Sequence, residues 1–482
     1  MISTKSLTKN QQTKRNIMVL IAVGMFVFMS TLDASIVNIA LPSIAHDLHI
    51  GSNQSTWTVT IYLIVVSGLM ILFGRLGDQV GQIRVFKVGT VIFTVGSLIA
   101  GFNFGLLFLL FARVVQAFGA AMTMSNSFGI LTSTFPPTQR ARVMAMNGIF
   151  VSIGLVSGPG LGGLILQFLP WNCIFWINVP IGIFAIIIGY FFFPNLPRPE
   201  KIFTIDWAGA ILFFATISIL FFGVEYGQNS GFVNLIFFGC TILAVILFIS
   251  FLLREQKIKH PLIDLTIFKN RIFSISVLAA FLTFVISFFM TITMPFYLQD
   301  LLGWSPGASG LVMMIFPVVL IIVGPISGYI ADHHNKEVIT AIGIGIVALT
   351  QIGFILFGRW TPVWFILLVM FINSIGNALF QSPNNALLMS SVPKTRLGVA
   401  GSLSALARNL GMICGISIST VLTFSQMKVQ SADAADMISN QPDLFVNGMH
   451  LTYWGAFIVA VASFMLVSYR LFTGYLRNKK NQ

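Results

Sequence analysis

The chain has 482 residues, of which 56% are hydrophobic and only 9% are charged. Its mean hydropathy is +0.91. Soluble domains contain about 25% charged residues, so this composition excludes a soluble protein and indicates a polytopic membrane protein. The three cysteines lie in apolar segments and show neither disulfide nor metal spacing. The first apolar run is too long for a cleavable signal peptide, and we expect it to be the first span.

Apolar segments of about 20 residues span a bilayer as helices. The sequence contains fourteen such segments, which predicts an all-α membrane protein. The segments cover residues 17–41, 54–73, 84–102, 105–127, 143–168, 173–194, 206–225, 233–253, 272–298, 307–330, 338–357, 362–389, 398–424 and 450–472.

The positive charges predict the orientation of these spans. With the N-terminus in the cytoplasm, 23 of the 27 Lys and Arg residues fall in cytoplasmic segments, as the positive-inside rule requires. Arg359 and Lys428 fall outside, and Arg113 and Arg408 fall within spans. We therefore expect both termini in the cytoplasm. The net charge of +13 follows from this topology and does not indicate a nucleic-acid partner.

Two pairs of similar segments indicate an internal repeat. FGRLGD at Asp78 resembles SGYIAD at Asp332, 254 positions later, and Pro136 and Pro393 lie in similar segments 257 positions apart. Repeated halves with a site between them are typical of transporters. The predicted organisation is a cytoplasmic tail (1–16), a six-helix half (17–195), two extra helices (196–255), a second six-helix half (256–475) and a cytoplasmic tail (476–482).

The segment GRLGDQVGQIR (74–84) lies at a cytoplasmic helix end. Its glycines permit close backbone approach and a tight turn, and Asp78 can pair with a cation or with backbone N–H groups. We expect a cytoplasmic gate, although an ordinary polar turn remains an alternative. The gate residues would be Gly74, Gly77, Asp78, Gly81, Arg84 and Asp332.

Arg113 begins RVVQAFGAA (113–121) inside the fourth span. A charge at membrane depth usually faces the protein interior and has a partner. Arg113 is therefore either a functional cation or a structural side chain that ties helices together.

The fifth span contains GLVSGPGLGG (154–163). This spacing places small residues on one side of the helix, which allows backbone contact with a neighbour, and a proline can bend the helix. The motif residues are Gly154, Gly158, Pro159, Gly162 and Gly163.

Together these motifs resemble the major facilitator superfamily, in its fourteen-span drug:proton antiporter branch. The 74–84 loop is similar to the first family signature, Arg113 with Gln116 and Gly119 to the second, and 154–163 to the antiporter signature. Four further segments resemble this branch, namely LDASIVNIALP (32–42), FWINVPIG (175–182), IDWAGA (205–210) and HPLIDLTIFKNR (260–271). The resemblance covers nearly the whole chain and says little about the substrate. Gln79, Gln82 and Ile83 replace the usual basic residues of the first signature, which predicts a weaker gate contact.

Asp33 is the main carboxylate candidate for a proton carrier, because it lies well inside a span. Placing such a charge at the bilayer centre costs about 2.5–3.5 kcal/mol on insertion scales. We expect Asp33 and Arg113 to couple transport to protons, with protonation of Asp33 competing against a cationic substrate. The alternative is that Asp33 only holds Arg113. The chain has no P-loop of the form GxxxxGK[ST], so we expect the proton gradient to supply the energy without a bound cofactor.

The resemblance implies a central substrate cavity between the halves. An aromatic and Met-rich cavity would suit bulky amphipathic compounds, although each candidate could instead be a packing residue. The candidates are Asn38, Trp57, Tyr62, Gln116, Met146, Phe150, Phe289, Tyr297, Asn377, Gln381 and Asn384.

The resemblance implies proton-driven efflux of amphipathic drugs or antibiotics by alternating access. We expect a functional monomer, in a bilayer that would be a bacterial cytoplasmic membrane. The alternative is a narrower exporter of a metabolite, a lipid-like compound or one antibiotic class. A membrane enzyme or receptor fits less well, because the repeat favours transport and the six histidines show no HExxH-type spacing.

Overall fold

The computed structural model describes residues 9–136, 140–193, 206–230, 234–258, 261–263, 265–393, 397–424, 427 and 437–480. All regular elements in these ranges are helices. Thirteen helical segments within them are long and apolar enough to cross a membrane. The other expected span, 143–168, lies in the 29-residue helix α6, whose apolar stretch Ile153–Phe168 is shorter. The expected all-α membrane fold is confirmed.

The first half of the chain precedes two extra helices, α9 (Trp207–Ser230) and α10 (Leu235–Lys257). Short breaks divide the second and sixth expected spans into two helices each. The elements of this half are α1 (Lys9–Asp47), α2 (Ser52–Ser55), α3 (Trp57–Val80), α4 (Gln82–Ala100), α5 (Leu106–Thr134), α6 (Arg140–Phe168), α7 (Cys173–Trp176) and α8 (Asn178–Phe192).

The second half begins after α10. A π-helical turn, η2, extends its first long helix, and a short break divides the next span. Its elements are η1 (Leu265–Lys269), α11 (Arg271–Phe296), η2 (Tyr297–Leu301), α12 (Pro306–Met313), α13 (Ile315–His333), α14 (Lys336–Ile355), α15 (Val363–Ser390), α16 (Leu397–Phe424), α17 (Met437–Asn440) and α18 (Pro442–Lys480).

The final helix starts earlier than the apolar run predicts. The sequence predicts that the last span begins at residue 450, whereas α18 begins at Pro442. Proline is favourable in the first turn of a helix, and Asp443 there complements the helix dipole. Polar residues 442–449 therefore extend the last span beyond its apolar part.

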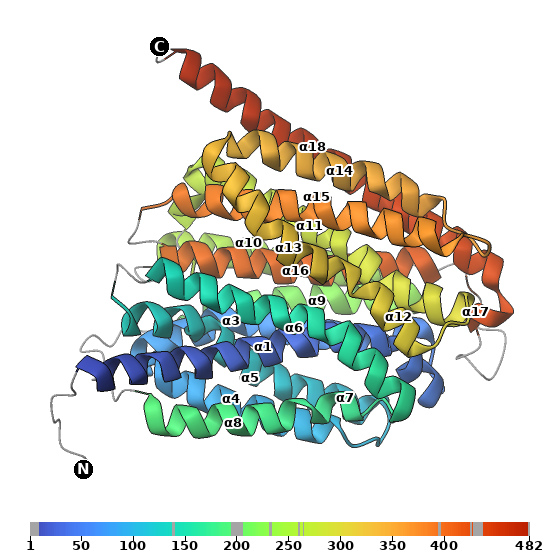
Figure 1. The fold of residues 1–482 in the computed structure, drawn as a ribbon, viewed down its shortest axis with the longest axis horizontal. Coiled ribbons are helices and arrows are strands. Elements are labelled where there is room, and N and C mark those ends of the chain that lie inside the picture. Colours follow the sequence, from blue (N-terminus) through green and yellow to red (C-terminus); the bar gives the residue numbers. More distant parts are fainter. Residues whose placement is uncertain are drawn as a thin grey trace.

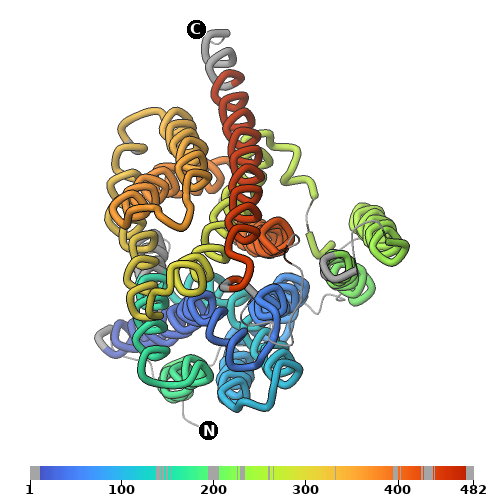
Figure 2. Tube along the Cα trace, turned by 90° about the vertical axis from the view of Figure 1, so that its right-hand side faces the viewer, coloured from blue at the N-terminus to red at the C-terminus, as the bar shows by residue number. Residues whose placement is uncertain are grey.

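The two halves lie side by side in the bundle. α1 begins and α18 ends at the same end, as the expected orientation requires, and α12 and α17 lie at the opposite end (Figure 1). Viewed along the bundle, the first half (blue to teal) and the second half (yellow to red) form two groups, with α9 and α10 at one side (Figure 2). The halves meet where α6 packs on α12, α3 on α16 and α1 on α11.

The internal repeat recurs as a pair of glycine-mediated helix crossings. In the first half, a Cβ on Gly89 would lie 2.8 Å from the carbonyl oxygen of Gly119, where α4 crosses α5. In the second half, a Cβ on Gly343 would lie 2.8 Å from the carbonyl oxygen of Gly376, where α14 crosses α15. Only glycine permits such backbone contact between helices, so equivalent positions impose the same packing in both halves.

The two extra helices pack against each other, and α9 also packs on α3. At one end of this hairpin, Arg254 Nε donates to Asp206 Oδ1 and Oδ2, both at 2.9 Å. Burial raises the pKa of Asp206, but the hydrogen bonds from Arg254 and from the Gly209 backbone N–H outweigh it and hold the pKa below its ordinary value. This carboxylate ties the start of α9 to the end of α10.

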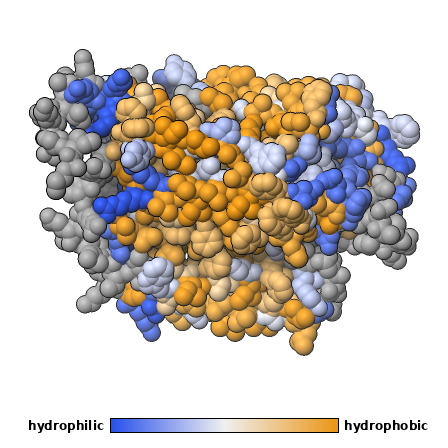
Figure 3. All heavy atoms as spheres, turned by 90° about the horizontal axis from the view of Figure 1, so that it is seen from below, coloured by the Kyte–Doolittle hydropathy of each residue, from blue (hydrophilic) through white to orange (hydrophobic). Residues whose placement is uncertain are grey.

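The surface matches a protein embedded in a bilayer. On the face shown in Figure 3, a broad apolar region covers the middle of the bundle between more polar ends. Many large apolar side chains are exposed to the surroundings, including Leu107 at 83% and Leu235 at 87%. In water such a continuous apolar surface would be unfavourable, so the protein is a multi-pass membrane protein.

Candidate functional site

The carboxylate of Asp33 lies in the middle of α1 and forms an ion pair with Arg113 of α5. Arg113 Nη1 donates to Asp33 Oδ2 at 2.6 Å, and both side chains are 0% exposed. Two charges away from water are stable together only if their remaining polar atoms also find partners.

The other oxygen of Asp33 accepts two further hydrogen bonds. Gln116 Nε2 donates to Oδ1 at 2.8 Å, and Asn178 Nδ2 of α8 donates to the same atom at 2.9 Å. Gln116 Nε2 also contacts Ser97 Oγ of α4 at 2.8 Å. Since donors from α5 and α8 face both oxygens, this environment satisfies an ionised carboxylate.

Arg113 connects this carboxylate to α3. Its Nε donates to the carbonyl oxygen of Thr58 at 2.8 Å. Its Cζ lies 4.3 Å from the centre of the Tyr62 ring and 5.6 Å from that of Phe175 in α7. The arrangement, which we call the Asp33 cluster, comprises Asp33, Thr58, Tyr62, Ser97, Arg113, Gln116, Phe175 and Asn178.

A cavity with about 1290 Å³ of empty space lies beside this cluster, between the two halves. The first half contributes residues of α1, α3, α5 and α6, and the second half contributes residues of α11, α12, α13, α15 and α16. Its wall is mostly apolar, with Phe284, Phe288, Phe316, Met290 and Met412 among the larger side chains. This central cavity has the lining of a site for an organic ligand, an apolar wall with a few polar groups.

Tyr62 belongs to both the central cavity and the Asp33 cluster, since it lines the cavity and its ring stacks on Arg113. Asp33 itself is fully buried and does not line the cavity. Its neighbours Ala34 and Ser30 do line it. A ligand in the cavity therefore adjoins the Asp33 cluster through Tyr62 and α1, without direct contact with the carboxylate in this arrangement.

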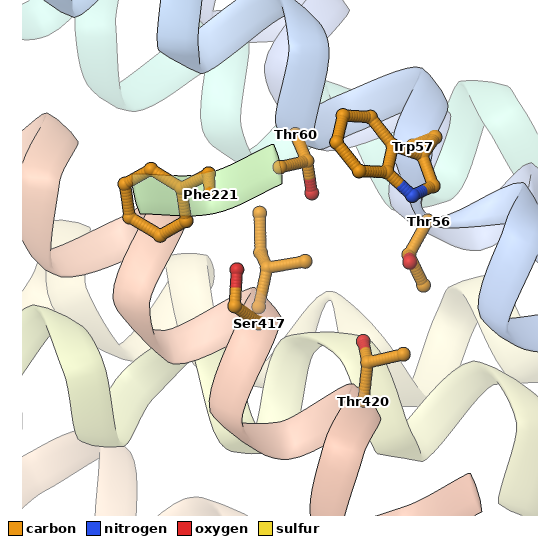
Figure 4. Close-up of a pocket in the computed structure, with 7 residues that line it drawn as sticks. Thr56, Trp57, Thr60, Phe221, Ser417 and Thr420 are labelled. Carbon is orange, nitrogen blue, oxygen red and sulfur yellow. The ribbon is translucent and has the colours of Figure 1, made fainter. Parts of the chain in front are cut away.

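Three of the expected cavity residues, Asn38, Tyr62 and Gln381, line the central cavity. Trp57 lines a smaller pocket of about 230 Å³ instead, together with Phe221 and Thr420. This pocket lies where α3, α9 and α16 meet (Figure 4).

The remaining expected cavity residues lie away from the central cavity wall. Gln116 belongs to the Asp33 cluster, Met146 is 41% exposed on α6, and the Phe150 ring packs against Gly24 of α1. Phe289 is fully buried in α11. Aromatic and amide residues within spans thus either pack between helices or line the cavity, and residue type alone does not predict which.

Three more of these residues make hydrogen bonds within the second half. The Tyr297 hydroxyl donates to the Gly358 carbonyl at 2.9 Å. Asn377 Oδ1 accepts from Ser287, a cavity-lining residue, at 3.1 Å. Asn384 Oδ1 accepts from Arg470 Nη1 at 3.0 Å.

The side chain of Arg470 is buried in the protein. The positive-inside count assigns Arg470 to a cytoplasmic segment, and in the structure it is only 2% exposed in α18. Its Nη1 also donates to Ser276 Oγ at 2.7 Å. Arg470 therefore packs inside the second half, and its long side chain lets the helix end carry a buried cation.

The expected cytoplasmic gate is a turn between α3 and α4. Gly81 has a φ of +107°, a conformation that favours glycine, and a Cβ on Gly77 would lie 2.6 Å from Asn126 Cγ of α5. Asp78 is exposed and accepts from Gln82 Nε2 at 3.0 Å.

Three further gate candidates make no close contact that supports a gate in the described residues. Gly74 approaches Ser125, with 3.7 Å from its Cβ position, and Arg84 is exposed. Asp332 lies in α13, but its side chain falls outside the described residues. The gate assignment remains a prediction.

The glycine motif of α6 forms two helix contacts. Toward α1, a Cβ on Gly154 would lie 2.7 Å from the Phe28 carbonyl oxygen and one on Gly158 3.0 Å from Ile36 N. Gly162 faces the same helix, and a Cβ on Gly162 would lie 2.6 Å from Ile39 Cγ2.

The second contact of this motif joins the halves. A Cβ on Gly163 would lie 2.7 Å from the Pro306 carbonyl oxygen and 3.3 Å from Gly310 Cα in α12. Pro159 presents its carbonyl to Gly310 and lines the central cavity. The motif thus connects the cavity to the interface between α6 and α12.

Further contacts join the halves at the end expected to face outside. His46 Nε2 lies 3.2 Å from Asp300 Oδ1, and Gln299 Nε2 donates to the Ile39 carbonyl at 3.1 Å. With the α6–α12 contact, they hold the outer ends of the two halves together in this structure.

Sequence reasoning missed part of both sites. Asn178 completes the Asp33 cluster, and Arg408 and Asn409 line the central cavity. Arg408 carries a signal, because it is a cation within a span. Asn178 lies in FWINVPIG (175–182), which resembles the family branch, but this resemblance did not indicate its contact with Asp33, 145 positions away in sequence.

Two helical halves around a central cavity, with a buried ion pair beside it, define a membrane transporter. The Major Facilitator Superfamily model matches residues 23–416, and the chain belongs to this family. The family expected from the sequence motifs is confirmed.

Similar proteins include transporters with different printed functions. The riboflavin transporter RibZ of Clostridioides difficile is 33% identical over 453 residues, which cover 94% of this chain and 97% of that protein. Multidrug resistance protein 3 of Bacillus subtilis is 31% identical over 448 residues, covering 88% and 85%. Among solved structures, an inward-facing bacterial homologue of the human lysosomal transporter Spinster has a TM-score of 0.66 at 14% identity, covering 94% and 96%. The last likeness supports the fold alone.

Proposed function

We propose that the protein is a proton-coupled exporter of amphipathic drugs or antibiotics that works as a monomer in a bacterial cytoplasmic membrane. The observation that carries this proposal is the apolar central cavity between the halves, directly beside the buried pair of Asp33 and Arg113. The similarity to a multidrug resistance protein supports the drug-exporting role.

In this mechanism the proton acts on the ion pair. Protonation of Asp33 removes the charge that holds Arg113 and turns an acceptor oxygen into a donor. The hydrogen bonds from Arg113 and Asn178 then weaken, which loosens α1 against α5 and α8. Since α1 also carries cavity residues such as Asn38, the proton and the substrate both act on the same helix.

Alternating access requires the outer contacts between the halves to break and reform. The α6–α12 contact and the pair of His46 with Asp300 would open when the cavity turns outward. A movement of α1 transmits directly to this interface, because α6 packs along α1 through Gly154, Gly158 and Gly162. No bound cofactor is needed, and the proton gradient would supply the energy.

Transport in proteoliposomes tests this proposal. An imposed proton gradient directed against substrate flow should drive uphill movement of at least one of three amphipathic probes of different charge, namely ethidium, riboflavin and dansylglycine. Asp33→Asn should reduce proton-driven transport at least tenfold while substrate exchange without a gradient persists. Asp443→Asn is the matched control, because that carboxylate is 85% exposed. Unchanged proton-driven transport in Asp33→Asn would contradict the coupling role.

The second candidate function is narrower export of a single metabolite, such as a flavin. It is favoured by the 33% identity to RibZ over 94% of this chain. Competition separates the two functions, because chemically unrelated amphiphiles should inhibit dye transport by a multidrug exporter. Transport inhibited only by flavins would support the narrower function.

A further inference from the structure

The central cavity has one charged side chain among its lining residues, Arg408 of α16. No Asp or Glu belongs to the described wall. Arg408 is partly exposed, and no hydrogen bond or ion pair reaches its guanidinium within the part of the chain that the structure describes. A cation at membrane depth is unfavourable unless it is paired or hydrated.

Asp33 does not supply the missing negative charge. It is fully buried outside the cavity wall. Its two oxygens already accept from Arg113, Gln116 and Asn178. The cavity surface beside Arg408 therefore carries an unbalanced positive charge.

The neighbouring residue adds a second donor without an acceptor. Asn409 is 3% exposed and lines the cavity, and its Nδ2 makes no hydrogen bond within the described residues. Gln381 of α15 also lines the cavity and offers an amide group. Buried donors rarely stay without a hydrogen-bond partner, so a ligand or a water in the cavity would satisfy them.

We propose that Arg408 and Asn409 bind an ionised acidic group of the transported compound, while its apolar body lies against the phenylalanine and methionine side chains of the cavity. The planar guanidinium can hold a carboxylate, sulfonate or phosphate through two parallel N–H···O bonds. The substrate class is then amphipathic organic anions. This inference rests on the proposed export function and narrows its substrate.

The same charge disfavours cationic compounds. A cationic ligand would face Arg408 without a carboxylate on the wall to balance it, and like charges in a binding site reduce affinity. A neutral ligand would leave the guanidinium unpaired. The site therefore selects its substrates by their charge.

Three dansyl probes that differ in charge test the proposal at pH 7.5. Dansylglycine carries a carboxylate, dansylglycinamide is neutral, and dansylcadaverine carries an ammonium group. Fluorescence titration of the purified protein should show that dansylglycine binds about tenfold more tightly than the other two. Equal affinities, preference for the cation, or no binding of dansylglycine would overturn the proposal.

Variants separate the charge from the shape of the site. Arg408→Gln should weaken dansylglycine binding about tenfold or more and leave dansylglycinamide within twofold, and Arg408→Lys should fall between because it loses the planar fork. Asn409→Asp keeps the arginine but adds a competing carboxylate, and should also weaken dansylglycine about tenfold. Arg359→Gln is the matched control, since Arg359 is 43% exposed and outside the cavity lining. An unchanged preference in both Arg408→Gln and Asn409→Asp would contradict the assignment.

Transport measurements distinguish this inference from the broader function. Proton-driven export of ethidium without any preference for dansylglycine would leave the exporter function intact and reject the anion site. Binding of dansylglycine that depends on Arg408, without proton-driven movement of any probe, would reject the exporter function and retain the anion site.

Discussion

The ring of Tyr62 lies 4.3 Å from Cζ of Arg113, and the same side chain lines the central cavity. It is therefore the side chain shared by the Asp33 cluster and the cavity wall. Arg113 in turn donates to Asp33 at 2.6 Å. A ligand that displaces Tyr62 would disturb the environment of the ion pair. In the proposed mechanism this would connect the substrate to the proton on Asp33 without direct contact between the two.

Replacement of Tyr62 should weaken this connection. Tyr62→Ala removes a cation–π contact of about 0.5–2 kcal/mol and leaves space beside Arg113. We expect weaker substrate binding and a lower ratio of transported substrate to protons, measured by dye and pH changes in proteoliposomes. Tyr62→Phe keeps the ring and should stay close to the wild type. A Tyr62→Ala variant with wild-type affinity and ratio would contradict the connection.

The Asp33–Arg113 pair should show strong energetic coupling. Removal of either partner leaves a buried group without its counterion, at a cost of about 3–5 kcal/mol. Asp33→Asn and Arg113→Gln should each lower the free energy of unfolding in mixed micelles, and the double variant should lose less than their sum. Additive losses would mean that the two side chains act independently.

The extra helices should depend on Asp206 in a pH-dependent way. Its pKa is lowered in the folded protein, so its stabilisation is present above the ordinary pKa of about 3.9 and is lost as the pH falls through the folded value. Asp206→Asn should lower stability at pH 7 by about 1 kcal/mol, a modest effect because Arg254 is 41% exposed. Thermal unfolding at several pH values should show the two proteins converging in acid. A difference in stability that does not shrink as the pH falls below the ordinary pKa of Asp206 would exclude this ion pair as its cause.

The fold could be predicted from the sequence because apolar length and charge placement act locally. Each span must satisfy its backbone hydrogen bonds internally, so fourteen apolar segments predict helices. Asp33 and Arg113 stood out for the same reason, since charges at membrane depth are rare. Their contact joins residues 80 positions apart, and the motif resemblance brought them together.

The cavity wall was harder to predict, because it depends on the rotation of each helix about its axis. Asn38 and Gln381 face the cavity, whereas Phe289 and Asn384 are buried in helix packing. Apolar spans carry little periodic signal that separates these faces, since lipid and protein interior are both apolar. Arg408 was visible as a charge within a span, but its position at the cavity follows from the packing of α16.

The contact between α6 and α12 should control the closed state of the outer end. A Cβ on Gly163 would lie 2.7 Å from the Pro306 carbonyl oxygen, which is too close, so Gly163→Ala should push the helices apart at a cost of about 1–3 kcal/mol. We expect longer spin-label distances between the outer ends of α6 and α12, and slower export. Gly324→Ala is the matched control, because nothing lies within 4 Å of its Cβ position and alanine favours helix by about 1 kcal/mol. If Gly163→Ala left both the distances and the export rate at wild-type values, this contact would not hold the outer end closed.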